Sequence, residues 1–167
     1  MKWVGVLLLL GASILTGFQL ASRLHDRVRL LRAVRGLIGR FSGELAYRRI
    51  STGQMLREAA SDPEFTSLPF LKPAAETFDG KIAFSVIWEN AVMRCRPPIA
   101  PEEREILLEI GRILGSSDRD SQQAALSLLA QRTEALLAAG TEKAAAEGKL
   151  YRSLGVLAGL FFIVLAL

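Results

Sequence analysis

The sequence predicts an all-α protein, a helical bundle of about six helices flanked by N- and C-terminal transmembrane helices. Apolar residues gather at the two ends, over residues 3–21 and 154–167. Between these ends, apolar residues recur at the three- and four-residue spacings of amphipathic helices. No segment alternates apolar and polar residues at period two, so no sheet is expected. The expected domains are a transmembrane anchor at 1–22, a cytoplasmic helical domain at 23–149 and a C-terminal transmembrane helix at 150–167.

The composition narrows the chemistry that the chain can carry. It has 167 residues, a net charge of +4, one cysteine (Cys95) and one histidine (His25). A single cysteine excludes an internal disulfide, and no cluster has the spacing of metal ligands. The segment 147–150 only superficially resembles the end of a phosphate-binding loop, because position 143 is Lys where that loop needs glycine and Leu150 replaces its serine or threonine. We therefore expect no catalytic site, no metal and no cofactor.

The N-terminal apolar segment is interpreted as an uncleaved anchor. Residues 3–21 contain no charge, which fits the ~20 residues that a helix needs to cross a ~30 Å hydrocarbon core. The alternative is a cleaved signal peptide, with Lys2 as its cationic start and Ala21 at the cut. The length of the segment and the arginines that follow it favour the anchor.

The C-terminal apolar segment is shorter. At ~1.5 Å per residue, residues 154–167 cover about 21 Å. Tyr151 and Arg152 can lengthen the span, because both side chains suit the membrane interface. A buried core helix is the alternative, although no polar stripe interrupts the run. Gly155 and Gly159 form a GxxxG pair, which predicts close packing against another membrane helix.

The basic residues predict the orientation. Eight arginines lie between residues 23 and 49, against only two acidic residues. Positive charges next to a membrane span stay on the cytoplasmic side. The middle domain is therefore expected in the cytoplasm, with both termini on the opposite side. The residues taken to set this topology at the membrane surface are Arg23, Arg27, Arg29, Arg32 and Arg152. Contact with a membrane span favours lipid headgroups over nucleic acid as the partner of this basic stretch.

The helices of the first half follow from spacing and punctuation. A helix over 23–50 carries an apolar seam at Leu31, Val34, Ile38, Phe41 and Leu45. Ser51 with Gln54 predicts a capping box that opens a short helix ending near residue 61. Residues 64–78 are expected to form a broken helix, because Pro69 and Pro73 each lack a backbone donor.

The helices of the second half have clearer boundaries. A helix beginning at Phe84 buries one face and ends at Pro97; this face comprises Phe84, Ile87, Trp88, Ala91 and Cys95. Pro101 suits the first position of the next helix, and Gly115 its end. Ser117 is expected to cap a final helix that runs on into the C-terminal span.

The turn at residues 114–119 has two readings. The simpler one is a helix stop followed by a cap. The other is a docking surface for a partner protein, with Asp118, Arg119 and Gln122 exposed together.

Two segments are distinctive, residues 114–122 (LGSSDRDSQ) and the tail 151–156 (YRSLGV). They resemble the stage III sporulation protein AB family of endospore-forming bacteria. The basic helix ending in residues 43–47 and Trp88 in a middle helix add to the resemblance, which covers the full chain.

The resemblance implies a place in the complex that joins mother cell and forespore, with the soluble domain in the mother-cell cytoplasm. It also implies similarity to the inner-membrane platform protein of type II secretion, and hence a non-enzymatic platform that contacts a secretion-type ATPase. Other membrane proteins of the complex would be further partners, and a homo-oligomer is left open. The rival hypothesis is a lipid-sensing or regulatory protein that reads anionic lipid with its arginine-rich helix.

Overall fold

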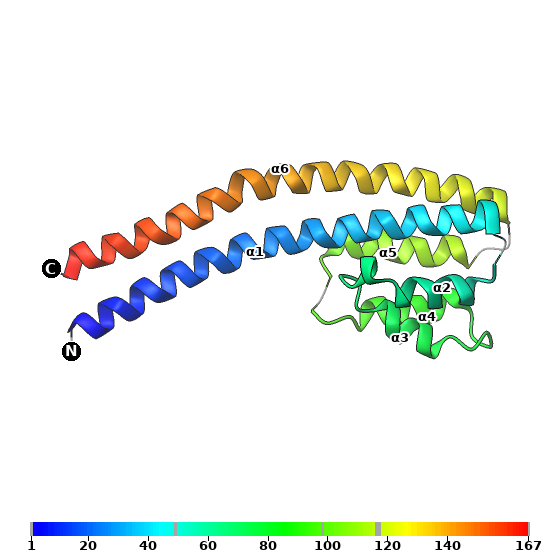
Figure 1. The fold of residues 1–167 in the computed structure, drawn as a ribbon, viewed down its shortest axis with the longest axis horizontal. Helices are drawn as coiled ribbons and strands as arrows, with labels where there is room; N and C mark the ends of the chain where they lie inside the picture. Colours follow the sequence, from blue (N-terminus) through cyan, green and yellow to red (C-terminus); the bar gives the residue numbers. More distant parts are fainter. Residues whose placement is uncertain (1, 49, 98, 116–117, 167) are drawn as a thin grey trace. The chain divides into compact units, whose positions relative to one another are not determined.

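The computed structural model describes the backbone of residues 2–48, 50–97, 99–115 and 118–166. Side chains are described except at 2–10, 13, 14, 48, 119, 152, 155, 158–160 and 162–166. Within these ranges the chain forms six α-helices and no strand, which confirms the all-α class. The prediction of about six bundle helices plus two flanking ones exceeds this number, because α1 and α6 each include one of the apolar end segments. The helices are α1 (Lys2–Gly43), α2 (Thr52–Ser61), α3 (Leu71–Thr77), α4 (Phe84–Met93), α5 (Pro101–Leu114) and α6 (Arg119–Ala166). A π-helical turn, Glu44–Arg48, follows α1, and a 3-10 turn, Pro63–Phe65, precedes α3 (Figure 1).

The chain divides into two compact units. The terminal unit contains residues 1–29 and 137–167, and the central unit contains residues 30–136. Both ends of the chain therefore belong to the same unit, where α1 and α6 lie side by side (Figure 1). A close approach between them is visible at Gly148, where an added Cβ would stand 3.6 Å from Cε1 of His25.

Helix α1 is one continuous helix through the boundary predicted at residue 23. Its seam in the central unit is as expected, because Leu31, Val34, Ile38 and Phe41 are each at most 1% exposed. Leu45 is only partly buried, since it follows the change to π-helical geometry after Gly43. The helix therefore ends earlier than residue 50, and the turn that leaves it starts at Glu44.

Local signals set the short helices that follow. The Ser51 hydroxyl accepts a hydrogen bond from the Gln54 backbone N–H at 3.3 Å, as predicted for the cap of α2. The Gln54 side chain instead donates to Glu58, so only half of a capping box forms. Pro73 lies in the first turn of α3, where a missing donor removes no intrahelical bond. The broken helix predicted over 64–78 is thus a 3-10 turn and one short α-helix.

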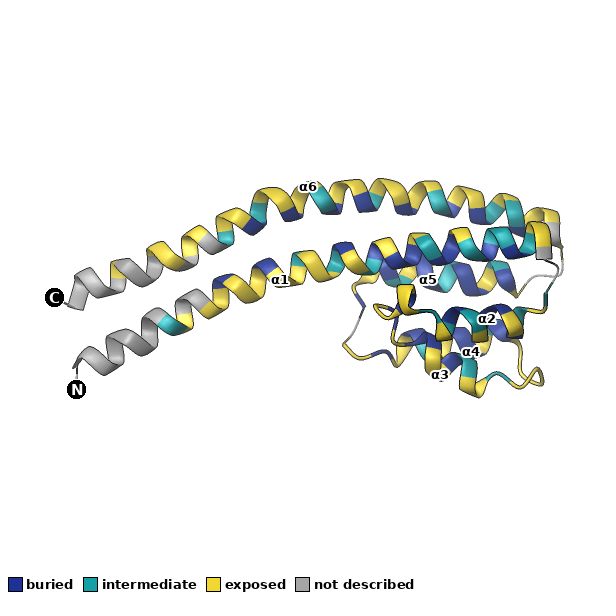
Figure 2. Ribbon diagram, viewed as in Figure 1, coloured by how far each residue is buried: buried dark blue, intermediate teal, exposed yellow. Residues whose placement is uncertain are grey.

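Trp88 of α4 is the centre of the core. It is fully buried, and its Nε1–H donates to the Leu107 carbonyl oxygen of α5 at 2.6 Å. Its ring meets those of Phe41, Phe70 and Phe84, with centroids 6.2, 5.2 and 5.4 Å away. Buried residues line the inner sides of α1 and α3–α5 around it (Figure 2). One aromatic side chain therefore joins three helices and the loop before α3.

The predicted buried face of α4 needs one change. Phe84, Ile87 and Trp88 are buried, and Val92 takes the place expected for Ala91, which is only partly buried. Helix α4 ends at Met93, so buried Cys95 lies after the helix and not on it.

Ion pairs and one hydrogen bond join α6 to α1 and α5 in the central unit. Arg35 of α1 pairs with Glu134 of α6, and Arg132 of α6 reaches Glu105 and Glu109 of α5 at 3.3 and 3.5 Å. Ser42 accepts a hydrogen bond from the Gln123 side chain at 2.8 Å. Helix α6 therefore lies against both α1 and α5 in the central unit.

Helix α6 continues without interruption from Arg119 to Ala166, as the sequence predicted. No helix in the part of the chain that the structure describes is both long enough and apolar enough to cross a membrane.

Candidate partner-binding surfaces

In the turn between α5 and α6, the predicted docking residues Asp118 and Gln122 differ in solvent exposure. Asp118 is exposed, and its carboxylate accepts a hydrogen bond from the Ser121 backbone N–H at 3.1 Å. This contact caps α6, so the cap comes from Asp118, whereas Ser117 lies outside the described residues. Gln122 is only 6% exposed. The joint exposure expected of these residues therefore does not hold for Gln122, and the Arg119 side chain lies outside the described residues.

The electrostatics of this turn favour a negative charge. The hydroxyl and the backbone N–H of Ser121 both bond to Asp118 and hold the pKa of that carboxyl below its usual value. The charge stands at the N-terminus of a helix, where the macrodipole also stabilises an anion. Asp118 is therefore an ionised, exposed carboxylate, suited to a cationic group on another protein. Partner binding by Asp118, Arg119 and Gln122 stays a prediction.

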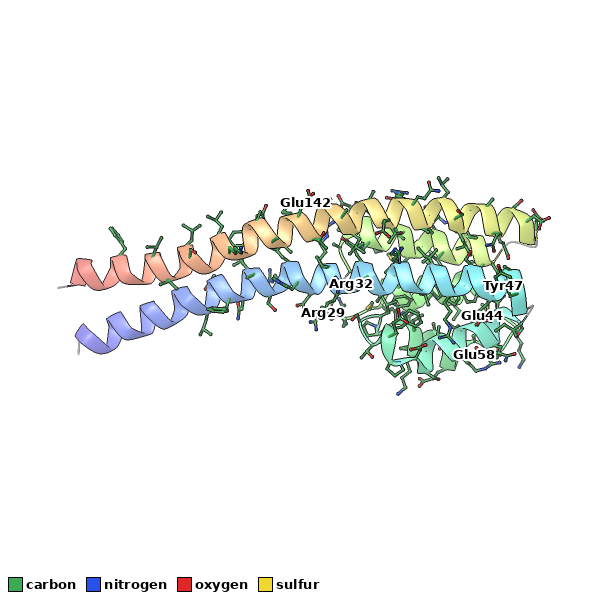
Figure 3. All side chains as sticks on the ribbon, turned by 45° about the horizontal axis from the view of Figure 1, so that its top comes forward. Arg29, Arg32, Glu44, Tyr47, Glu58 and Glu142 are labelled. Atoms are coloured by element: carbon green, nitrogen blue, oxygen red, sulfur yellow. The ribbon has the colours of Figure 1, made fainter. Side chains whose placement is uncertain are left out.

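The arginine-rich part of α1 lies mostly open to solvent. Arg23, Arg29 and Arg32 are exposed, and Arg27 is partly buried. Arg29 pairs with Asp26 one turn earlier at 2.5 Å. Figure 3 labels Arg29 and Arg32 on α1. The exposed side chains of Arg23, Arg29 and Arg32 give this part of α1 a basic surface.

Three of the predicted site residues belong to the C-terminal apolar segment and its edge. Arg152, Gly155 and Gly159 lie outside the residues whose side chains the structure describes. Membrane helix packing by the two glycines, and a topological role for Arg152, stay predictions.

The sequence has one histidine and one cysteine, His25 and Cys95. His25 Nδ1 lies 2.9 Å from the Ala21 carbonyl oxygen of its own helix. Cys95 is buried, and burial raises the pKa of its thiol. Within the described residues, no group of three or more His, Cys, Asp and Glu is placed to hold a metal ion.

Sequence reasoning missed one feature, an open groove between α3 and α4. The available signal was that α4 carries apolar residues off its buried face: Val86 and Met93 are 48% and 58% exposed. Ile82, just before the helix, is 52% exposed. A helix that is apolar on more than one side predicts a second contact surface.

The fold and these surfaces define an all-helical protein without a recognisable catalytic or metal site among its described residues. The chain belongs to the stage III sporulation protein AB family, because the model of that family matches residues 2–167. A similar protein is the stage III sporulation protein AB of Bacillus subtilis strain 168. It is 27% identical over 170 residues, which cover 99% of this chain and 98% of the relative. No solved structure matches the chain.

Proposed function

We propose that this chain is a non-enzymatic platform subunit of the sporulation complex that links mother cell and forespore. Its apolar ends would anchor it in the mother-cell membrane that faces the forespore. Its helical domain would lie in the mother-cell cytoplasm and contact a secretion-type ATPase, and other membrane proteins of the complex would be further partners. Family membership over the full chain supports the sporulation role.

The observation that carries the proposal is the continuity of α1 and α6. At ~1.5 Å per residue, the 42 residues of α1 extend about 63 Å, roughly twice the ~30 Å of a hydrocarbon core. One helix can therefore carry the uncharged segment 3–21 proposed to lie in the membrane and also supply the seam of the central unit. Helix α6 likewise contains residues of the central unit and the uncharged segment 154–166. In this proposal the two helices tether the central unit to the membrane, and no chemistry is required of them.

The charge distribution supports the orientation. The segment from residue 23 to 49 carries eight arginines and only Asp26 and Glu44 as acidic residues. This excess beside the first apolar segment favours a cytoplasmic central unit. Reporter fusions after Leu167 test it: a C-terminal tag is expected on the side of the membrane opposite the central unit. A tag found in the mother-cell cytoplasm would contradict the anchoring scheme.

The proposed ATPase contact is tested at Asp118. Full-length chain is purified in detergent from sporulating cells, and co-purified ATPase is quantified. Asp118→Asn removes the charge but keeps a capping residue, because Asn and Asp cap helices about equally well. We expect a several-fold loss of ATPase, with Glu142→Ala as the control, since Glu142 is an exposed carboxylate on the same helix (Figure 3). Retention of the ATPase at wild-type level would remove this surface from the proposal.

The second candidate is a lipid-sensing or regulatory protein, favoured by the exposure of Arg23, Arg29 and Arg32. Each such residue near an anionic leaflet adds about 1 kcal/mol of attraction. Arg29→Gln and Arg32→Gln together are expected to leave ATPase co-purification unchanged if the chain is a platform. Co-sedimentation with phosphatidylglycerol vesicles that depends on both arginines, without any ATPase co-purification, would favour the lipid sensor.

A further inference from the structure

The central unit has an open groove with mainly apolar walls. It lies between α3 and α4, has a volume of about 470 Å³, and falls in the size range of small ligand sites. Its apolar walls include Phe70, Pro73, Ala74, Ile82, Val86 and Ile87. Ile82 and Val86 expose about half of their surface, which would be removed from water by an occupant.

The charge of the groove has one sign. Arg94 and Arg96 line it, and no acidic residue does. Both guanidinium groups are exposed, and neither forms an ion pair with a described residue. Arginine binds a carboxylate through two parallel N–H···O bonds, so this end of the groove is complementary to an acidic group.

The neutral polar groups in the groove can pair with a polypeptide backbone. One Asn90 side-chain N–H donates to the Val86 carbonyl oxygen at 2.9 Å, which leaves the second N–H and the carboxamide oxygen available. The Thr77 hydroxyl donates to the Pro73 carbonyl oxygen at 2.8 Å, which leaves its lone pairs available. A peptide group supplies both a donor and an acceptor, and therefore matches this set of groups.

We propose that the α3–α4 groove binds a segment of a partner protein that carries apolar side chains and ends in carboxylates. The proposal rests on the scaffold role only in assigning a protein as the occupant. It concerns a surface other than the turn at Asp118. A platform with two separate protein contacts can hold two components of a complex at once.

The direct test uses full-length chain in detergent and two fluorescein-labelled synthetic peptides. Both carry leucines at helical spacing; one ends in two glutamates and the other in two glutamines. Fluorescence anisotropy is expected to show at least tenfold tighter binding of the acidic peptide. Equal affinity for the two peptides would overturn the proposal, because the charge complementarity would then do nothing.

Variants place the binding in the groove. Val86→Asp is expected to weaken binding of the acidic peptide at least tenfold. Met93→Asp is the matched control, because Met93 is 58% exposed on the same helix but does not line the groove. Equal effects of the two substitutions would overturn the assignment of the groove. Both substituted positions are exposed, so both variants are expected to fold. Thermal unfolding followed by circular dichroism checks this.

Charge reversal tests the arginines independently of packing. Arg94→Glu with Arg96→Glu is expected to reverse the preference, so that a third peptide ending in two lysines binds better than the acidic one. An unchanged preference would contradict the role of the arginines. Phosphatidylglycerol vesicles are added as a competitor: no displacement of the acidic peptide is expected. Displacement that Val86→Asp abolishes would overturn the proposal in favour of a lipid occupant.

The groove proposal and the platform proposal can fail independently of each other. If no ATPase co-purifies with the wild-type chain, the platform proposal fails, while specific binding of the acidic peptide would still establish the groove. If the ATPase co-purifies but the acidic peptide shows no preference, the groove proposal fails alone.

Discussion

Replacing Gly111 with alanine tests the arrangement of the core around Trp88. An added Cβ at Gly111 of α5 would stand 2.5 Å from Cδ1, 3.0 Å from Cγ and 3.2 Å from Nε1 of Trp88. Non-bonded carbon atoms prefer about 3.5–4.0 Å, so the indole would have to retreat by roughly 1 Å. It has little room, because Phe41, Phe70 and Phe84 surround it.

The expected change in the free energy of unfolding combines two destabilising effects and one stabilising effect. Overpacking a dense core costs about 1–3 kcal/mol. Loosening the hydrogen bond from Trp88 to the Leu107 carbonyl adds about 0.5–1.5 kcal/mol. Alanine gains back up to about 1 kcal/mol of helix propensity. Gly111→Ala should therefore lower the free energy of unfolding by about 2 kcal/mol, which corresponds to a fall in Tm of roughly 4–8 °C for a chain of this size.

A matched control is available in α1. An alanine Cβ at Gly39 would meet nothing within 4 Å. Gly39→Ala should therefore raise stability by up to about 1 kcal/mol, through propensity alone. Both variants are measured as full-length protein in detergent, by thermal and urea unfolding followed by far-UV circular dichroism.

The reasoning fails if Gly111→Ala is as stable as the wild type while Gly39→Ala is stabilised. A double-mutant cycle with Trp88→Phe isolates the contact, because phenylalanine lacks the five-membered ring that the new methyl group would strike. Gly111→Ala should cost less in the Trp88→Phe background than in the wild type. An equal cost in both backgrounds would place the damage elsewhere.

Three further predictions concern single side chains. The Arg40 side chain is 28% exposed and pairs with the carboxylates of Glu58 and Asp62. Arg40→Met should therefore lower Tm by a few degrees, and by less at high salt, because salt screens the ion pairs. A fall in Tm that 1 M NaCl leaves unchanged would contradict an electrostatic role. The bonds from Ser121 lower the pKa of Asp118, so its ionised form stabilises the fold above its unfolded-state pKa, roughly 3.9, and this stabilisation is lost as the pH falls through the lower folded pKa. The stability difference between wild type and Asp118→Asn should thus be constant at neutral pH and change below about pH 4; a difference that is flat down to pH 2 would refute it. Burial and a raised pKa should make the Cys95 thiol react with a disulfide reagent far more slowly in the native than in the unfolded chain, and equal rates would refute its burial.

The seam of α1 shows what periodicity can predict. The three- and four-residue spacing of Leu31, Val34, Ile38 and Phe41 puts them on one side of any helix, so their burial follows from the chain alone. The cap at Ser51 and the start of α5 at Pro101 are equally local, because the bonding groups involved lie within a few residues of each other.

The turn before α6 shows where local reasoning stops. The same spacing argument left Gln122 free to be exposed, but the helices packed around α6 bury it. Likewise, Gly111 looked like an ordinary helix residue until the indole of Trp88, 23 positions earlier in the chain, was found against it. Contacts between residues distant in sequence depend on how the helices are oriented, and no spacing within one helix encodes that.

The all-helical class, the bounds of α2 and α5, the start of α4, the uncharged ends, the basic stretch beside the first of them and the family all follow from the amino-acid sequence. Each of these depends on neighbours along the chain, through backbone hydrogen bonding, period and local charge. Only the tertiary structure decided that Trp88 joins three helices, that Asp118 and Gln122 have different exposure, and that α3 and α4 leave a basic apolar groove open. These features arise where separate helices meet, because the shape between two packed surfaces belongs to neither sequence segment alone.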